Sequence, residues 1–379
     1  MERRDENGVA HLLEHMVFRG GARYPTPHAV SAAVARLGGY LNGYITHDLV
    51  AYHATVRCDD APAALDLLTD IVGKPRLDPA DVDVERRVAV DEIARRRERP
   101  EVVADELLDR AAFGDHPLGR AVVGREEVVR GLTAEDLRGF RGRAYAPHRG
   151  VAVLVGDLRV VPSEQLTTLL ERIPQIGSDA EPQRAAPEAA NGRLAEQRGD
   201  GRSRLRLAYR VPIDVGENRS RAAFKVLASI LGGSVGSRLY DDLRVRRGLC
   251  YSVFAVARTA ADAALLTLSA EVGSDHSRET LTLMREHVER LRSEPPSERE
   301  VEDACRYLAG RRLLALEQTR AVARYVARER ILYGCRVDPE DAVRSIEGVT
   351  SDDVARVART LPDDFAFACV GPHSIDALV

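Results

Sequence analysis

The sequence has few cysteines, almost no lysine, no long apolar run and no large excess of charge. Its five cysteines are scattered and never form a C-x-x-C pair, so we expect buried small apolar residues in a reducing compartment. No apolar stretch is long enough to span a bilayer and no signal-like segment opens the chain, which predicts a cytoplasmic protein that does not bind membranes. A net charge of −4 gives no basis for binding nucleic acid.

The length and composition predict two globular domains. A chain of 379 residues is too long for one ordinary core and fits two domains of roughly 150–200 residues each. With 44% apolar and 30% charged residues, the chain should be soluble. Residues 177–198 are rich in Ala, Pro, Glu and Gly without periodicity, so we expect an interdomain linker there between domains at 1–176 and 199–379.

The segment from Gly8 to Met16, GVAHLLEHM, carries the strongest chemical signal in the chain. His11 and His15 are four residues apart, so on a helix both imidazoles project from one face and can bind a single ion, with Glu14 beside them. A catalytic zinc takes three protein ligands and an open position for water. The order His-x-x-Glu-His is the inverted form of the metalloprotease helix. The segment therefore predicts a catalytic zinc site that lacks its third ligand.

This motif alone leaves an alternative open, because the chain has ten histidines and two of them could lie by chance on a solvated helix. His47 and His53 show no spacing that supports metal binding, and we expect them to be structural. The segment from Asp78 to Ala94 predicts a second helix, with Pro79 near its first position and apolar Val84, Val88 and Ile93 on one side. Glu85 and Glu92 are two turns apart and share a face of that helix.

With these two segments the chain resembles the M16 metallopeptidases, the family of pitrilysin and the mitochondrial processing peptidase. Glu92 lies 77 residues beyond His15, close to the separation at which that family places a glutamate as third zinc ligand. The resemblance implies that Glu92 is the third ligand of a Zn²⁺ ion and that Glu85 orients the site. It also implies a two-domain member of the M16B type.

The resemblance implies an α+β fold with two homologous domains of the LuxS/MPP-like type, each a mostly antiparallel sheet covered by helices. Residues 132–137 and 349–354 both read as capped helix starts, and each is followed by an apolar segment, Val151–Asp157 and Phe365–Gly371, that predicts a closing strand. Two copies of one unit are the economical interpretation. Because the family forms strands before the metal motif, the resemblance also implies that the first strands of the N-terminal domain are missing.

Two further segments match the family's substrate-binding positions. Residues 40–45 and 49–56 predict a β-hairpin, and the resemblance implies that a peptide adds as a strand beside it, with Asn42 and Gly43 in contact. Gly43 replaces the usual alanine. In the second half, Arg244 and Tyr251 are seven residues apart and match the family's Arg/Tyr pair, which implies that both face the zinc.

The predicted activity is zinc-dependent hydrolysis of peptides or unfolded polypeptide segments. Glu14 would be the general base, and Arg244 and Tyr251 would donate hydrogen bonds to a substrate carbonyl. The resemblance implies a chamber formed by a homodimer or by a heterodimer with a related subunit. Two alternatives remain, a non-catalytic partner or scaffold subunit and a structural metal. The substrate is left open among general peptide debris, leader peptides and targeting presequences.

Overall fold

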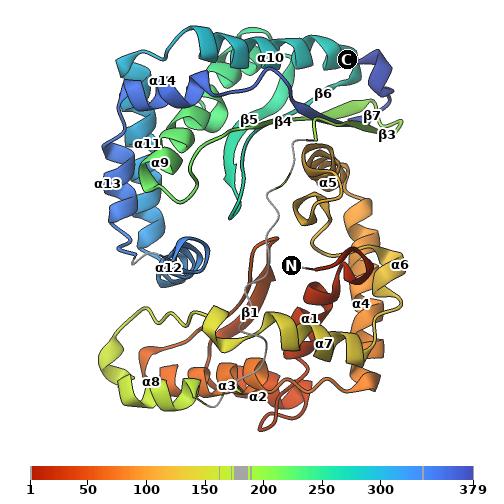
Figure 1. Ribbon diagram of the computed structural model, residues 1–379, viewed down its shortest axis with the longest axis vertical. Coiled ribbons are helices and arrows are strands. Elements are labelled where there is room, and N and C mark those ends of the chain that lie inside the picture. Colours follow the sequence, from red (N-terminus) through yellow and green to blue (C-terminus); the bar gives the residue numbers. More distant parts are fainter. Residues whose placement is uncertain are drawn as a thin grey trace. The chain divides into compact units, whose positions relative to one another are not determined.

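The computed structural model describes residues 2–161, 163–171, 173–174, 187, 190–334 and 337–378 (Figure 1). The chain divides into two compact units that are interleaved in the sequence. Unit 1 comprises residues 1–95, 121–184 and 318–336, and unit 2 comprises residues 96–120, 185–317 and 337–379. Each unit therefore contains a segment that the sequence alone would assign to the other half.

Unit 1 combines several helices with one small sheet. Strands β1 (Tyr40–Ile45) and β2 (Val50–Thr55) form an antiparallel hairpin in which Gly43 lies opposite Tyr52. The longer helices of this unit are α1 (Val9–Val17), α2 (Pro27–Arg36), α3 (Ala61–Gly73), α4 (Pro79–Arg97), α7 (Ala134–Ala144), α8 (Ser163–Leu170) and α12 (Thr319–Tyr333). Shorter helical turns are η1 (Arg4–Glu6), η2 (Cys58–Asp60), α6 (Glu126–Val129), η4 (Pro147–Arg149) and η5 (Leu158–Val160).

The core of unit 1 places α1 against α4. Leu12 and Met16 of α1 are fully buried and belong to one apolar cluster with Val82 and Ile93 of α4. Burial of such side chains contributes about 1.5–3 kcal/mol each, which fixes the two helices against each other. The sequence predicts Val84, Val88 and Ile93 on one side of α4, but Ile93 is buried whereas Val84 and Val88 are 36% and 47% exposed. The apolar positions of α4 that contact the core are Val82, Ala89, Val90 and Ile93.

Unit 2 is built on a five-stranded sheet with the order β3-β7-β4-β6-β5. The strands are β3 (Arg193–Gln197), β4 (Arg202–Arg210), β5 (Cys250–Thr259), β6 (Ala264–Gly273) and β7 (Ala366–Gly371). All neighbouring pairs are antiparallel except β3 and β7, which run parallel. The prediction of a mostly antiparallel sheet is therefore confirmed for this unit.

Helices cover both faces of this sheet (Figure 1). One face packs on helices of the second half of the chain, and the other packs on α5 (Pro100–Phe113), whose Leu108 and Ala112 meet Ala208, Leu265 and Ala366. The helices of the first face and the connecting turns are α9 (Asn218–Ala228), η6 (Ser229–Gly233), η7 (Tyr240–Arg246), α10 (Ser277–Ser293), α11 (Glu298–Leu316), α13 (Asp341–Glu347) and α14 (Ser351–Arg359). The turns η3 (Pro117–Gly119), η8 (Ser274–His276) and η9 (Ile375–Ala377) complete the unit.

The helix starts that the sequence predicts within residues 132–137 and 349–354 are confirmed by their caps. Thr26 caps α2, and Thr133 and Thr350 form capping boxes with Asp136 and Asp353 at α7 and α14. Each side-chain oxygen accepts a hydrogen bond from an otherwise unpaired backbone N–H of the first turn. Ser237 precedes η7 without capping it, because its hydroxyl donates to the backbone oxygen of Ser234.

Two predicted boundaries are wrong. Residues 193–197, assigned to the linker, form strand β3, because they pair with β7; much of the remaining linker range lies outside the described residues. Residues 151–157, predicted as a buried strand, form no strand, and Val151 and Val155 are 37% and 36% exposed. This segment pairs with no described strand, so it completes no hydrogen-bonded ladder.

The cysteines follow the predicted pattern with one exception. Cys250, Cys305 and Cys369 are buried free thiols, but Cys58 is exposed at the turn η2, where a short helical turn leaves its side chain outside the core. Cys335 lies outside the described residues. Within the described part of the chain, no helix has the length and apolarity needed to cross a membrane.

Candidate metal centre

Helix α1, which carries His11 and His15, begins at a closely packed glycine. Gly8, before the helix, has a φ of 105°, and a Cβ there would lie 2.9 Å from the Cα of Gly124. Only glycine tolerates this combination of backbone angle and close approach. One turn apart on α1, the rings of His11 and His15 have centroids 4.6 Å apart. The local sequence thus fixes both the position of α1 and the direction of its imidazoles.

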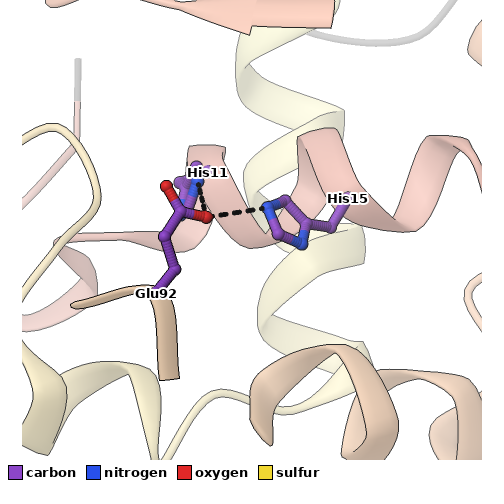
Figure 2. Close-up of side chains that lie close together, drawn as sticks. All are labelled: His11, His15 and Glu92. Carbon is purple, nitrogen blue, oxygen red and sulfur yellow. Dashed lines mark ion pairs between the residues drawn. The ribbon is translucent and has the colours of Figure 1, made fainter. Parts of the chain in front are cut away.

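Glu92 of α4 reaches between these two imidazoles. Its Oε2 lies 3.5 Å from Nε2 of His11 and 3.6 Å from Nε2 of His15, and Figure 2 shows this single oxygen between the two rings. His11 is 6% exposed at its side chain, while the Glu92 side chain is 41% exposed. The three groups therefore converge at a point that is enclosed by α1 and open on the side of α4.

A chain of ion pairs orients His15 from the opposite side. Oε2 of Glu85 lies 3.1 Å from Nδ1 of His15, and Oε1 of Glu85 lies 3.3 Å from Nη1 of Arg19. Arg19 also donates to Asp81 at 2.5 Å. Because Nδ1–H donates to Glu85, the imidazole of His15 presents its Nε2 to Glu92. Glu85 thus orients His15 so that Nε2 lies on the side of the metal group.

The imidazoles and carboxylates of this group shift one another's pKa values. Burial lowers the pKa of His15, but hydrogen bonds to Glu85 and Glu92 outweigh it and raise the pKa to about 9. The hydrogen bonds from His11 and His15 hold the pKa of Glu92 well below its usual range. The carboxylates of Glu85 and Glu92 stabilise the proton on His15. The same two carboxylates would stabilise a metal cation bound at this point.

The spacing of these atoms fits a zinc ion. The three ligand atoms lie within 4.8 Å of one another, and tetrahedral zinc with bonds of about 2.0–2.1 Å separates its ligand atoms by about 3.3 Å. The separations of 3.5 and 3.6 Å from Glu92 Oε2 to the two Nε2 atoms are close to that value. This is the only group of three or more potential ligands among the residues that the structure describes. Two imidazoles and one carboxylate match the donor set of catalytic zinc sites.

Glu14 lies beside the metal group and against the hairpin. A Cβ on Gly43 would lie 2.7 Å from Oε1 of Glu14, so the glycine leaves space that an alanine would take from the carboxylate. Burial raises the pKa of Glu14, and the neighbouring His11 and His15 oppose that shift. A carboxylate whose pKa is raised accepts a proton more readily near neutral pH.

Two buried tyrosines lie close enough to Glu14 for its charge to act on them. The hydroxyl groups of Tyr52 and Tyr145 are 2.8 Å apart, and burial raises the pKa of Tyr145 to about 12. Glu14 adds to the rise in the pKa of both phenols. Both tyrosines therefore stay protonated and neutral beside Glu14. Neither was identified from the sequence, because 93 residues separate them and no local pattern joins them.

Asn42 and Gly43 lie at the edge of β1 as the hairpin prediction requires. The Gly43 N–H donates to Oδ1 of Asn42 at 2.8 Å, so this backbone group is capped by a side chain rather than by a neighbouring strand. β1 pairs only with β2 among the described strands. The outer edge of β1 can therefore accept an added strand once Asn42 turns away.

Arg244 and Tyr251 are adjacent in unit 2, on η7 and β5. The guanidinium carbon of Arg244 lies 4.7 Å from the centre of the Tyr251 ring and 4.9 Å from that of Tyr240. Tyr251 is 82% exposed, which is unusual for a large aromatic residue in a sheet. Gly248, with a φ of 64°, ends the helical segment so that β5 can begin.

The segment that carries Arg244 is anchored at two points. Arg238 makes a paired contact with Glu300 of α11, at 2.7 and 3.1 Å, and Asp242 bonds to Nε2 of His287 on α10 at 2.8 Å. The hydrogen bonds from Arg238 help to lower the pKa of Glu300 to about 2. η7 has the wide π pattern, in which the Arg247 N–H bonds to the oxygen of Asp242. These anchors hold Arg244 beside Tyr251.

The sequence pointed to the metal group but missed several residues that support it. Arg19 follows His15 by four residues, just beyond the end of α1, and this spacing is the signal that could have identified it. Asp81 lies one helical turn before Glu85 on α4, which is a comparable signal. No comparable signal identifies the Tyr52–Tyr145 pair.

Comparison with known proteins identifies the family of this chain. Residues 1–126 match the model of the insulinase family, peptidase family M16, and residues 131–308 match that of the peptidase M16 inactive domain. An uncharacterised zinc protease of Mycobacterium bovis is 33% identical over 97% of this chain and 84% of its own length. The beta subunit of the mitochondrial-processing peptidase of Blastocladiella emersonii is 27% identical over 98% and 81%.

Solved structures show the same fold. A peptidase M16 inactive domain from Pseudomonas fluorescens superposes with a TM-score of 0.85 at 24% identity, covering 97% of this chain and 89% of its own. A protease from Helicobacter pylori gives the same TM-score at 20% identity, covering 98% and 90%. The predicted α+β fold is thereby confirmed. The chain belongs to peptidase family M16, a family of zinc metallopeptidases, as a member of the M16B type.

Proposed function

We propose that this protein is a zinc-dependent endopeptidase that hydrolyses peptides or unfolded polypeptide segments. The observation that carries the proposal is the convergence of His11, His15 and Glu92 on one point, with Glu14 beside them. Two imidazoles and one carboxylate leave a tetrahedral zinc with an open position. Zinc bound there would act as a Lewis acid and make water nucleophilic near neutral pH.

The protein's own residues supply the remaining chemistry. Glu14 would accept a proton from the attacking water and pass it to the leaving amine, a contribution of typically about 10²–10⁴-fold in rate. Gly43 leaves room for this carboxylate beside β1, where the peptide backbone would pair. Glu85 acts on the reaction through His15 and is a positioning residue.

The proposal extends to a chamber and a second subunit. Arg244 and Tyr251, from unit 2 of a partner chain, would donate hydrogen bonds to a substrate carbonyl next to the zinc of unit 1. Such directed donors contribute about 10²-fold or more. A homodimer would then hold two complete sites. A heterodimer with a related chain is the alternative, and a relative named as a beta subunit supports considering it.

Zinc content and cleavage of a quenched fluorogenic peptide library test the proposal together. We expect one zinc ion per chain, and we expect Glu14→Gln to abolish cleavage while zinc is retained. Glu135→Gln, an exposed acid of α7 in the same unit, is the matched control and should cleave normally. Cleavage that survives in Glu14→Gln would overturn the assignment of the base.

A non-catalytic partner or scaffold subunit is the second candidate. The match of residues 131–308 to an inactive domain is the observation that favours it, although His11, Glu14, His15 and Glu92 are all present in this chain. If the protein binds zinc but cleaves no peptide, alone or after mixing with related M16 chains, the endopeptidase proposal fails in favour of this candidate.

A further inference from the structure

The two faces of the β1–β2 hairpin carry different chemistry. Along β1, Gly43 is directed at Glu14, since a Cβ there would meet that carboxylate. Successive side chains of a strand point to opposite faces, so Asn42 and Tyr44 lie on the other face. His53, the register partner of Asn42, shares this second face. The metal group thus acts from one face, and the second face is left for side-chain recognition.

Helix α12 of unit 1 places an arginine against this second face. The guanidinium carbon of Arg324 lies 4.4 Å from the centre of the Tyr44 ring. Arg320 is one turn earlier on α12 and projects from the same face of the helix. Burial lowers the pKa of His53, and the charges of Arg320 and Arg324 lower it further. Both arginines are therefore close enough to the hairpin for their charges to act on it.

These two arginines have no acidic partner in the described part of the chain. Both side chains are exposed, and neither forms an ion pair there, whereas Arg328, one turn further along, lies 3.2 Å from Glu329. Contact with the Tyr44 ring holds the Arg324 guanidinium beside the hairpin, and a guanidinium on an aromatic face can still donate its N–H groups. The second face of the hairpin therefore presents two uncompensated positive charges next to the free edge of β1.

We infer that Arg320 and Arg324 select peptides that carry Asp or Glu at alternate positions. This inference rests on the proposed function, because it assigns the chemistry of the peptide that adds to β1. A strand added at that edge lies about 4.8 Å from β1 and directs every second side chain to the face of Asn42 and Tyr44. A carboxylate on that face meets the guanidinium of Arg324, and the intervening side chains face Glu14 and the metal group.

The test measures peptide binding separately from cleavage. Fluorescence anisotropy is recorded with the Glu14→Gln variant and nine-residue labelled peptides in which one Asp is moved through successive positions. Each Asp peptide has a twin with Asn at the same position. We expect the Asp peptide to bind about 3- to 10-fold more tightly than its twin at every second position, with a smaller difference at high salt.

The double variant Arg320→Gln/Arg324→Gln should remove this difference. Arg330→Gln is the matched control, because Arg330 is exposed on α12 but lies six residues from Arg324 and so on another face. Equal binding of the twins, a difference that persists in the double variant, or no binding of any peptide would overturn the inference. Since binding is measured without turnover, an acidic preference can be found even if the proposed peptidase activity fails.

Discussion

The two units of this chain differ in how their functional residues are supported. Unit 2 has a five-stranded sheet with helices on both faces, and it contributes Arg244 and Tyr251 from η7 and β5. Unit 1 has only the β1–β2 hairpin as described sheet, and it holds the metal group on helices α1 and α4. The group with the most demanding geometry therefore lies in the unit with the smaller sheet.

The difference shows that the metal group depends on helix packing. In unit 2, β7 is paired on both sides, by β3 and β4, whereas residues 151–155 of unit 1 pair with no described strand. His11, His15 and Glu92 nonetheless converge, because α1 and α4 share one apolar cluster. The hairpin lies against Glu14 at Gly43, and β1 has an edge that pairs with no other described strand.

Loss of a metal ligand should give the largest difference between the units. His15→Asn removes one of three ligands, so we expect zinc content to fall to near zero and cleavage to fall by about 10³-fold or more. His276→Asn, an exposed histidine of unit 2, should change neither. Metal analysis and peptide cleavage measure both effects. Normal zinc content in His15→Asn would show that the ion binds elsewhere.

Changes at the Arg/Tyr pair should reduce cleavage without affecting the metal. Arg244→Gln or Tyr251→Phe removes a hydrogen-bond donor, and we expect kcat/KM to fall by about 10²-fold at unchanged zinc content. Arg246→Gln is the control, since Arg246 is on the same segment but pairs with Asp241. Unchanged kinetics in both variants would mean that unit 2 takes no part in the reaction.

Glu85→Gln should weaken zinc binding while leaving all three ligands in place. The amide cannot hold the Nδ1–H of His15 as strongly, and we expect zinc affinity to fall by about 10- to 100-fold. Asp81→Asn should have a smaller effect, because Asp81 contacts Arg19 and not His15. Competition with a chromophoric chelator measures these affinities. Equal effects of the two substitutions would argue against a direct role of Glu85.

The smallest expected difference between the units is in the stability that one capping box contributes to each. Asp353 is 3% exposed at its side chain and also bonds to Arg219, whereas Asp136 is exposed and, among the described residues, bonds only to Thr133. Asp353→Asn should lower the free energy of unfolding by about 1–2 kcal/mol and Asp136→Asn by about 0.5 kcal/mol. Urea denaturation monitored by circular dichroism measures the difference.

The same aspartate makes the stability of unit 2 depend on pH. Burial alone would raise the pKa of Asp353, but the bonds from Arg219 and Thr350 outweigh it and lower the pKa to about 2 from 3.8. The stabilisation is therefore complete above pH 3.8 and is lost as the pH falls through 2. Asp353→Asn should flatten the acid side of the stability curve. An unchanged curve would show that Asp353 does not contribute.

Local features were predicted from the sequence, and long-range ones were not. Thr133 and Thr350 identify helix starts because a cap acts within one turn. The packing of α5 on the sheet of unit 2, the place of α12 in unit 1 and the pairing of β3 with β7 leave no local pattern. Residues 151–157 show the converse case. Their local sequence predicts a strand, but they pair with no described strand.

The site divides in the same way. His11 and His15 were found by their helical spacing, but Glu92 needed the family resemblance, because a separation of 77 residues carries no local signal. The contact of Arg324 with Tyr44 joins residues 280 positions apart, so only the structure shows it.

Zinc K-edge X-ray absorption of the metal-loaded protein tests the central claim most directly. The arrangement of His11, His15 and Glu92 predicts a first shell with two imidazole nitrogens, at least one carboxylate oxygen and no sulfur. The His15→Asn variant should show no such shell. Sulfur ligands, fewer than two imidazoles, or an unchanged spectrum in His15→Asn would contradict the claim that α1 and α4 build the metal centre.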